Sequence, residues 1–163
     1  PGIVVRTPDP NSPGRHLVTD PKLPECPQLK IVRVDGSLFF GAVDHVQGEF
    51  HRFQVEDPGQ QHLLIIGNGI NFVAIAKRRQ NLGGGLYLSK VKEEACRLLK
   101  RGGFVDRLGD EHIFVTKADA IQTIFKRLDR SICERCDKRI FLECQGIVYK
   151  GGKPLAADKI AAA

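Results

Sequence analysis

Three cysteines near the C-terminal end of the chain have the spacing of a partial metal site. Cys133 and Cys136 are separated by two residues, and Cys144 follows. A two-residue spacing lets neighbouring thiolates share one ion, but a structural zinc site needs four ligands. The fourth, Cys26 or a histidine, would have to come from elsewhere in the chain, so zinc is not expected. A thioredoxin-like redox pair would lie at a helix N-terminus after an early strand, and these thiols follow the final predicted helix, so unligated thiols are the favoured interpretation.

A loop rich in glycine and asparagine is the candidate ligand-binding segment. It follows the apolar run at 62–66, which has the pattern of a strand buried on both faces. The carboxyl edge of such a strand is where ligands usually bind in open α/β sheets, and a following helix N-terminus favours anions or nucleotides. A plain turn explains the same composition, and Phe72 stands where a dinucleotide fingerprint needs its third glycine. The candidate residues are Gly67, Asn68, Gly69, Asn71 and Phe72.

Positive charge is concentrated in the second half of the chain. Residues 1–76 contain 6 Lys or Arg against 8 Asp or Glu, and residues 77–163 contain 19 against 11. Such a field attracts nucleic acid, anionic lipid or an acidic protein, although a merely solvated face has the same composition. The candidate partner- or lipid-facing residues are Lys77, Arg78, Arg79, Arg127, Arg130, Arg135, Lys138 and Arg139.

Nothing in the sequence favours an enzyme. The Gly83-Gly84-Gly85 run lacks the Lys-Ser/Thr of a phosphate loop, and the five histidines are scattered without a helical metal-binding pair. Five cysteines are an odd number without the dense spacing of a secreted disulfide scaffold, which favours free thiols in a reducing compartment. The longest apolar run has five residues, far short of the roughly 20 that span a bilayer.

Proline and charge divide the chain into three predicted segments. Seven of the nine prolines fall within residues 1–27, which predicts an extended connector over 1–28 with at most one short strand at Ile3-Val4-Val5. The folded domain is predicted over residues 29–130. Residues 131–163 form a basic tail that contains cysteines.

The hydrophobic periodicity of residues 29–130 predicts an α/β fold. An Asp35-Gly36 turn between the runs 29–34 and 37–40 predicts an antiparallel hairpin. Short strands then alternate with helices, which indicates parallel pairing. Strands are predicted at 62–66, 86–88 and 113–115, and helices at 43–53, at 72–80, at 89–99 with Ser89 as N-cap, and at 117–128 with a Thr116–Asp119 capping box. The expected fold is a mixed sheet of about five strands with about four helices.

Three sequence runs together resemble the STAS domain found at the C-terminus of SulP-type anion permeases. They are LKIVRVDGSLFFG at 29–41, HLLIIGNGINFV at 62–73 and YLSKVKEEACRLLKRGGFVDRLGDEHIFVTKADAI at 87–121. The resemblance implies a fold like that of anti-sigma-factor antagonists. It also implies a regulatory or docking domain on the cytoplasmic side of the bacterial inner membrane, part of a transporter of sulfate, bicarbonate or dicarboxylates.

The partners that the resemblance implies are the transporter's own membrane domain and, compatible with the charge, an acidic protein, an anionic lipid surface or a second copy of the chain. Neither catalysis, nor nucleic acid, nor a resident cofactor is expected, apart from the nucleotide considered above. One departure follows Val73, where part of the family's second helix has no counterpart; either the protein has a deletion there or residues are missing from the sequence.

A freestanding anti-sigma-factor antagonist is the main alternative. In that branch a phosphorylatable Ser or Thr opens the second helix, and neither residue type occurs between Gly67 and Gln80. The transporter branch is therefore favoured. A small zinc-dependent nucleic-acid binder is a third interpretation, which draws on the positive charge and the cysteines.

Overall fold

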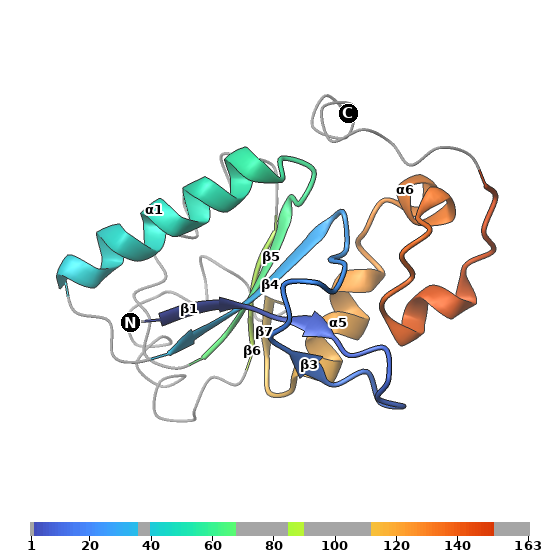
Figure 1. Cartoon of the computed structure of the whole chain (residues 1–163), viewed down its shortest axis with the longest axis horizontal. Coiled ribbons are helices and arrows are strands. Elements are labelled where there is room, and N and C mark those ends of the chain that lie inside the picture. The colour runs from blue at the N-terminus through green and yellow to red at the C-terminus, as the bar shows by residue number, and fades with distance from the viewer. Residues whose placement is uncertain (1, 36–39, 68–84, 90–111, 152–163) are drawn as a thin grey trace.

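A five-stranded sheet forms the centre of the molecule in the computed structural model, which describes residues 2–35, 40–67, 85–89 and 112–151 (Figure 1). The strand order is β1-β4-β5-β6-β7. These strands are β1 (Gly2–Val5), β4 (Leu29–Asp35), β5 (His62–Ile66), β6 (Leu86–Ser89) and β7 (Ile113–Phe114). A separate two-stranded ribbon joins β2 (Thr7–Pro8) to β3 (Leu17–Val18).

The sheet is mixed, as the sequence predicts. β1 runs antiparallel to β4 with Ile3 opposite Val34, and β4, β5, β6 and β7 are mutually parallel. The predicted strands at 62–66, 86–88 and 113–115 are confirmed to within one residue at their ends. The antiparallel pair, however, is not the predicted hairpin.

The hairpin prediction for 29–34 and 37–40 is wrong. Both edges of β4 are already paired, one with β1 and the other with β5, and Phe40 begins helix α1 (Phe40–Glu56). An Asp-Gly turn is a strong local signal, but here tertiary pairing with the N-terminal strand overrides it. Residues 36–39 lie outside the described part of the chain.

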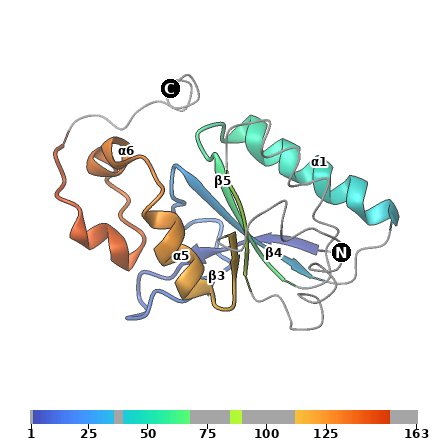
Figure 2. The ribbon, with the colours of Figure 1, turned by 180° about the vertical axis from the view of Figure 1, so that it is seen from behind.

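Alternate residues of the central strands face opposite sides of the sheet, as the two-residue period of a strand requires. Leu63 and Ile65 pack with Phe50 and Phe53 of α1. Leu64 and Ile66 face the other way, where helix α5 (Lys117–Phe125) packs. Figures 1 and 2 show α1 on one side of the sheet and α5 on the other. Each fully buried Leu or Ile contributes roughly 1.5–3 kcal/mol to the free energy of unfolding.

The predicted start of α5 is confirmed by its cap. Thr116 has extended backbone angles, and its Oγ1 accepts a hydrogen bond from the Asp119 amide at 3.1 Å. The bond satisfies one of the amides that a helix start leaves unpaired.

A buried lysine ties the N-terminal segment to the sheet. The Lys30 side chain is only 4% exposed, and its Nζ lies 2.8 Å from Glu25 Oε1 and 3.7 Å from Asp57 Oδ2. The ammonium also lies 4.7 Å from the centre of the Phe53 ring. Burial of a charge is tolerated when it is paired in this way.

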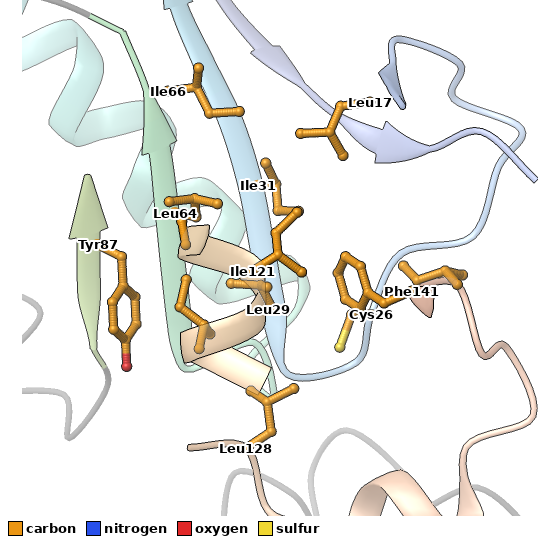
Figure 3. Close-up of a cluster of buried hydrophobic side chains, with 13 residues drawn as sticks. Leu17, Cys26, Leu29, Ile31, Leu64, Ile66, Tyr87, Ile121, Leu128 and Phe141 are labelled. Carbon is orange, nitrogen blue, oxygen red and sulfur yellow. The ribbon is translucent and has the colours of Figure 1, made fainter. Parts of the chain in front are cut away.

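Packing crosses both boundaries of the predicted connector–domain–tail division. The apolar cluster beneath α5 contains Leu17 and Cys26 from the predicted connector, and Ile140 and Phe141 from the predicted tail (Figure 3). Beyond residue 129 the chain forms helix α6 (Arg130–Arg135) and the 3-10 helix η2 (Leu142–Gly146). The boundaries at 28 and 130 therefore do not separate packed units. The proline content of this segment did not prevent the strands β1, β2 and β3 from forming, and Pro8 itself lies in β2 of the separate ribbon, outside the central sheet.

Some expectations fall on residues that the structure does not describe. The predicted helix at 72–80, the helix body after residue 89 and the junction after Val73 are among them. Ser89 itself is described as the last residue of β6, and the helix that it was predicted to cap lies outside the described residues.

Candidate functional site

The carboxyl edge of the sheet is organised around Gly67. Its φ of +150° is a backbone conformation that favours glycine, and a Cβ at this position would lie 2.9 Å from the Val34 carbonyl oxygen. The Gly67 amide donates to the Ser89 carbonyl at 3.3 Å. Gly67 therefore brings the ends of β4, β5 and β6 together. The other four candidate ligand residues, 68, 69, 71 and 72, lie outside the described residues.

Ser89 lies at the same edge and was missed as a site residue. It is completely buried, and its Oγ has no hydrogen-bond partner among the described residues. A buried hydroxyl without a partner is costly. The sequence offered a serine after an apolar strand, but no signal that its hydroxyl would be enclosed.

A stack of aromatic and basic side chains occupies the other end of β6. Tyr87 is 2% exposed; its ring stacks on His112 at 4.7 Å between centroids, and its hydroxyl is 3.2 Å from His62 Nδ1. His112 Nδ1 lies 2.8 Å from the Leu86 carbonyl oxygen, which can only accept, so Nδ1 donates and Nε2 accepts from Arg127 at 3.3 Å. The Arg127 guanidinium lies 5.5 Å from the centre of the Tyr87 ring. Arg127, predicted to face a partner, is thus engaged within the fold.

The C-terminal segment is attached to the sheet through the Gln28 side chain. The amide of this buried residue pairs with the backbone of Asp129: Oε1 accepts from the Asp129 amide at 2.8 Å, and Nε2 donates to the Asp129 carbonyl at 3.1 Å. These two bonds join residues separated by 101 positions in the sequence. They place the start of α6 beside the strand β4.

Asp129 also caps α6. Its Oδ1 accepts from the Ser131 hydroxyl at 2.6 Å and from the Ser131 amide at 2.9 Å. These hydrogen bonds favour the carboxylate and lower the pKa of Asp129.

Arg139 has a structural position rather than the exposed one predicted from the charge pattern. It is half-buried with a φ of +45°, and its guanidinium donates to the carbonyls of Cys144 at 3.0 Å and Ile147 at 2.7 Å. The guanidinium also lies 5.6 Å from the centre of the Tyr149 ring. Arg139 thereby fixes the loop that includes η2.

The other described members of the predicted set of partner-facing basic residues are exposed on and around α6. They are Arg130, Arg135 and Lys138. Because they lie on one short segment that is attached to the core, they present positive charge at a defined place on the surface. Lys77, Arg78 and Arg79 lie outside the described residues.

The four described cysteines carry free thiols. Burial raises the pKa of Cys26 to about 12 and that of Cys133 to about 11, and it also raises the pKa of Cys144. All four line one cavity between the C-terminal segment and the body of the domain. Within residues 2–35, 40–67, 85–89 and 112–151, no three His, Cys, Asp or Glu side chains are already grouped as metal ligands.

Among the residues that the structure describes, none of the helices has the length and apolar character needed to cross a bilayer.

The known proteins to which the chain is similar are named as sulfate transporters. No family model matches the sequence. Two Mycobacterium tuberculosis proteins, "Probable sulfate transporter MT1781" (strain CDC 1551 / Oshkosh) and "Probable sulfate transporter Rv1739c" (strain H37Rv), are each 25% identical over 129 residues, which is 72% of this chain and 23% of the relative. The chain therefore spans about a quarter of the length of these relatives.

A solved structure has the same fold. The crystal structure of a sulfate transporter family protein from Wolinella succinogenes superposes with a TM-score of 0.52 at 20% identity, covering 70% of this chain and 93% of that one. At this identity the likeness concerns the fold. The chain is thus related to a segment of proteins named sulfate transporters, and it has the mixed α/β fold of a domain from that family.

Proposed function

We propose that the chain is the STAS domain of a SulP-type anion transporter and that it regulates or docks the transporter on the cytoplasmic side of the bacterial inner membrane. The observation that carries the proposal is the share of each similar protein to which this chain can be aligned. The chain matches about a quarter of each sulfate transporter, yet it covers nearly all of a single solved domain from that family. A domain that has its own core and is appended to a larger transporter explains both the low coverage of the transporters and the high coverage of the solved domain.

The proposed domain acts by contact rather than by catalysis. Two of the described side chains that could react are used in the fold: Lys30 is paired with Glu25, and His112 is bonded on both ring nitrogens. Burial favours the protonated form of the Cys26 and Cys133 thiols, which are weak nucleophiles in that form. These arrangements support a structural role for the groups concerned.

The exposed cations of α6 and the following loop are the proposed docking surface. Arg130, Arg135 and Lys138 would face an anionic lipid surface or an acidic protein. Each cation near an anionic membrane contributes about 1 kcal/mol of binding free energy. Substituting all three by Gln should therefore weaken binding to vesicles containing anionic lipid by roughly a hundredfold at low salt. Lys22→Gln, a change at an exposed lysine of the N-terminal segment, is the control.

A second proposed role is binding of an anion or nucleotide at the carboxyl edge. The Ser89 hydroxyl, which is fully buried beside Gly67 and has no hydrogen-bond partner in the described part of the chain, favours it. Addition of sulfate or ADP should then shift the amide resonances of Gly67 and Ser89. Unchanged resonances at millimolar ligand would remove this role.

The main proposal is tested by membrane association and sidedness of the complete gene product. A fluorescent protein fused after residue 163 should be membrane-bound and fluorescent, and a phosphatase that is active only in the periplasm should be inactive at the same position. A fusion protein found in the soluble fraction would favour the freestanding antagonist. An active phosphatase would place the domain on the wrong side of the membrane.

A further inference from the structure

A cavity of atomic size separates the C-terminal segment from the body of the domain. Its volume is about 20 Å³, about enough for one water molecule, and all four described cysteines contribute to its wall. They are Cys26, Cys133, Cys136 and Cys144. The sequence alone places only the last three near one another.

The four cysteines come from separate elements that meet at this cavity. Cys26 lies in the loop before β4, Cys133 in α6, Cys136 at the end of α6, and Cys144 in η2. Cys26 is within electrostatic range of Cys133 and Cys136. Cys144 and Cys136 in turn act on Cys133. The fold therefore supplies the fourth sulfur that the C-terminal motif lacks.

We propose that Cys26, Cys133, Cys136 and Cys144 form a four-thiolate site for a soft divalent cation, of which zinc is the best fit. Zinc accepts four thiolates in a tetrahedron with Zn–S distances of about 2.3 Å, and two of these ligands have the two-residue spacing common in structural sites. Binding exchanges four S–H bonds for four Zn–S bonds and releases four protons to the solvent. The sulfurs are not oxidised.

Binding requires the sulfurs to converge on the cavity. In the described part of the chain no three of these groups already stand at ligand distance from a common point. Three of the four lie on α6, its end and η2, elements of 6 and 5 residues, so the proposed site requires these elements to move toward Cys26 when the cation binds. Convergence would fill the cavity and fasten the C-terminal segment to the loop before β4.

The surroundings complement the charge of such a site. Four thiolates and one Zn²⁺ carry a net charge of −2. Arg130 acts electrostatically on Cys133 and Arg139 on Cys144, each favouring the thiolate, and Lys138 lines the cavity. Gln28 Nε2 also donates to Cys133 Sγ at 3.4 Å. Cations and N–H donors around the sulfurs stabilise a tetrathiolate centre.

The test uses the whole 163-residue chain, purified without chelator and titrated with Zn²⁺ and with Co²⁺. We expect one zinc per chain and a cobalt spectrum with thiolate charge-transfer bands and the intense visible bands of tetrahedral coordination. Cys26→Ser should abolish that spectrum, although Cys26 lies outside the CxxC motif. Cys96→Ser, which alters the fifth cysteine of the sequence, is the control and should leave it unchanged.

A measurement on the unaltered chain tests the site even if the cysteine variants fail to fold. Zinc should protect four of the five thiols from a thiol reagent, and a chelator should restore their reactivity. Absence of stoichiometric zinc, a cobalt spectrum of octahedral type, or zinc binding that survives Cys26→Ser would each overturn the proposal. This site is independent of the proposed transporter function, so either can fail without the other.

Discussion

The Gln28 side chain holds the C-terminal segment on the domain, and its removal has a calculable cost. Gln28→Ala deletes both hydrogen bonds to the Asp129 backbone, at 2.8 and 3.1 Å. Each bond contributes about 1 kcal/mol, and leaving the Asp129 amide and carbonyl without these partners adds to the loss. We therefore expect the free energy of unfolding to fall by about 2–3 kcal/mol.

Urea unfolding of the purified chain measures this change. The midpoint should fall at an unchanged slope, and the melting temperature should drop by about 4–12 °C for a domain of this size. Hydrogen exchange at the Asp129 amide should accelerate. Gln145→Ala, at an exposed residue of η2, is the control. The reasoning is refuted if the two variants differ by less than about half a kcal/mol, the usual range of surface changes.

Three further predictions concern a close backbone approach, a helix cap and a buried ion pair. Gly67→Ala should lower the free energy of unfolding in urea by about 1–3 kcal/mol, because the φ of Gly67 is +150° and the new Cβ would meet the backbone of β4. Gly48→Ala, whose Cβ would meet nothing within 4 Å, should instead stabilise α1 by up to about 1 kcal/mol. Equal effects of the two changes would contradict this account. Asp129→Ala should lower the free energy of unfolding by about 1 kcal/mol at pH 7. Hydrogen bonds lower the pKa of Asp129 in the folded protein, so the difference in stability between the variant and the unaltered protein should persist above the ordinary pKa of 3.8. It should disappear as pH falls through the lower pKa of the folded state. A difference that grows in acid would refute the assigned cap. Lys30→Met should be tolerated better than Lys30→Ala in thermal melts, because Met retains the packing on Phe53 while Ala opens a cavity. The reverse order would contradict a packing role for the Lys30 side chain.

The sheet could be predicted from the sequence because its strands carry their own signals. His62–Ile66 is a continuous apolar run, and the structure buries Leu63 and Leu64 on opposite faces. The cap at Thr116 was likewise readable from a local pattern. Such features depend on residues that are close together in the sequence, so they can be predicted from the sequence alone.

The pairing of β1 and the packing of the C-terminal segment could not be predicted because they depend on distant residues. Gly2–Val5 displaces the local Asp35-Gly36 hairpin by pairing with β4. Gln28 meets Asp129 across 101 positions, and Cys26 reaches the same cavity as Cys144. None of these contacts has a period or a spacing that the sequence displays. The burial of the Ser89 hydroxyl could not be predicted for the same reason, since its enclosure is a property of the assembled sheet.

Uptake of labelled sulfate by the complete gene product tests the central claim most directly. The assay uses cells that lack their own sulfate permeases, and membrane levels are matched between the intact protein and a version without residues 1–163. The account predicts uptake by the intact protein and a clear change in its rate without this domain. Absence of anion uptake by the intact protein, for sulfate and equally for bicarbonate and dicarboxylates, would contradict it.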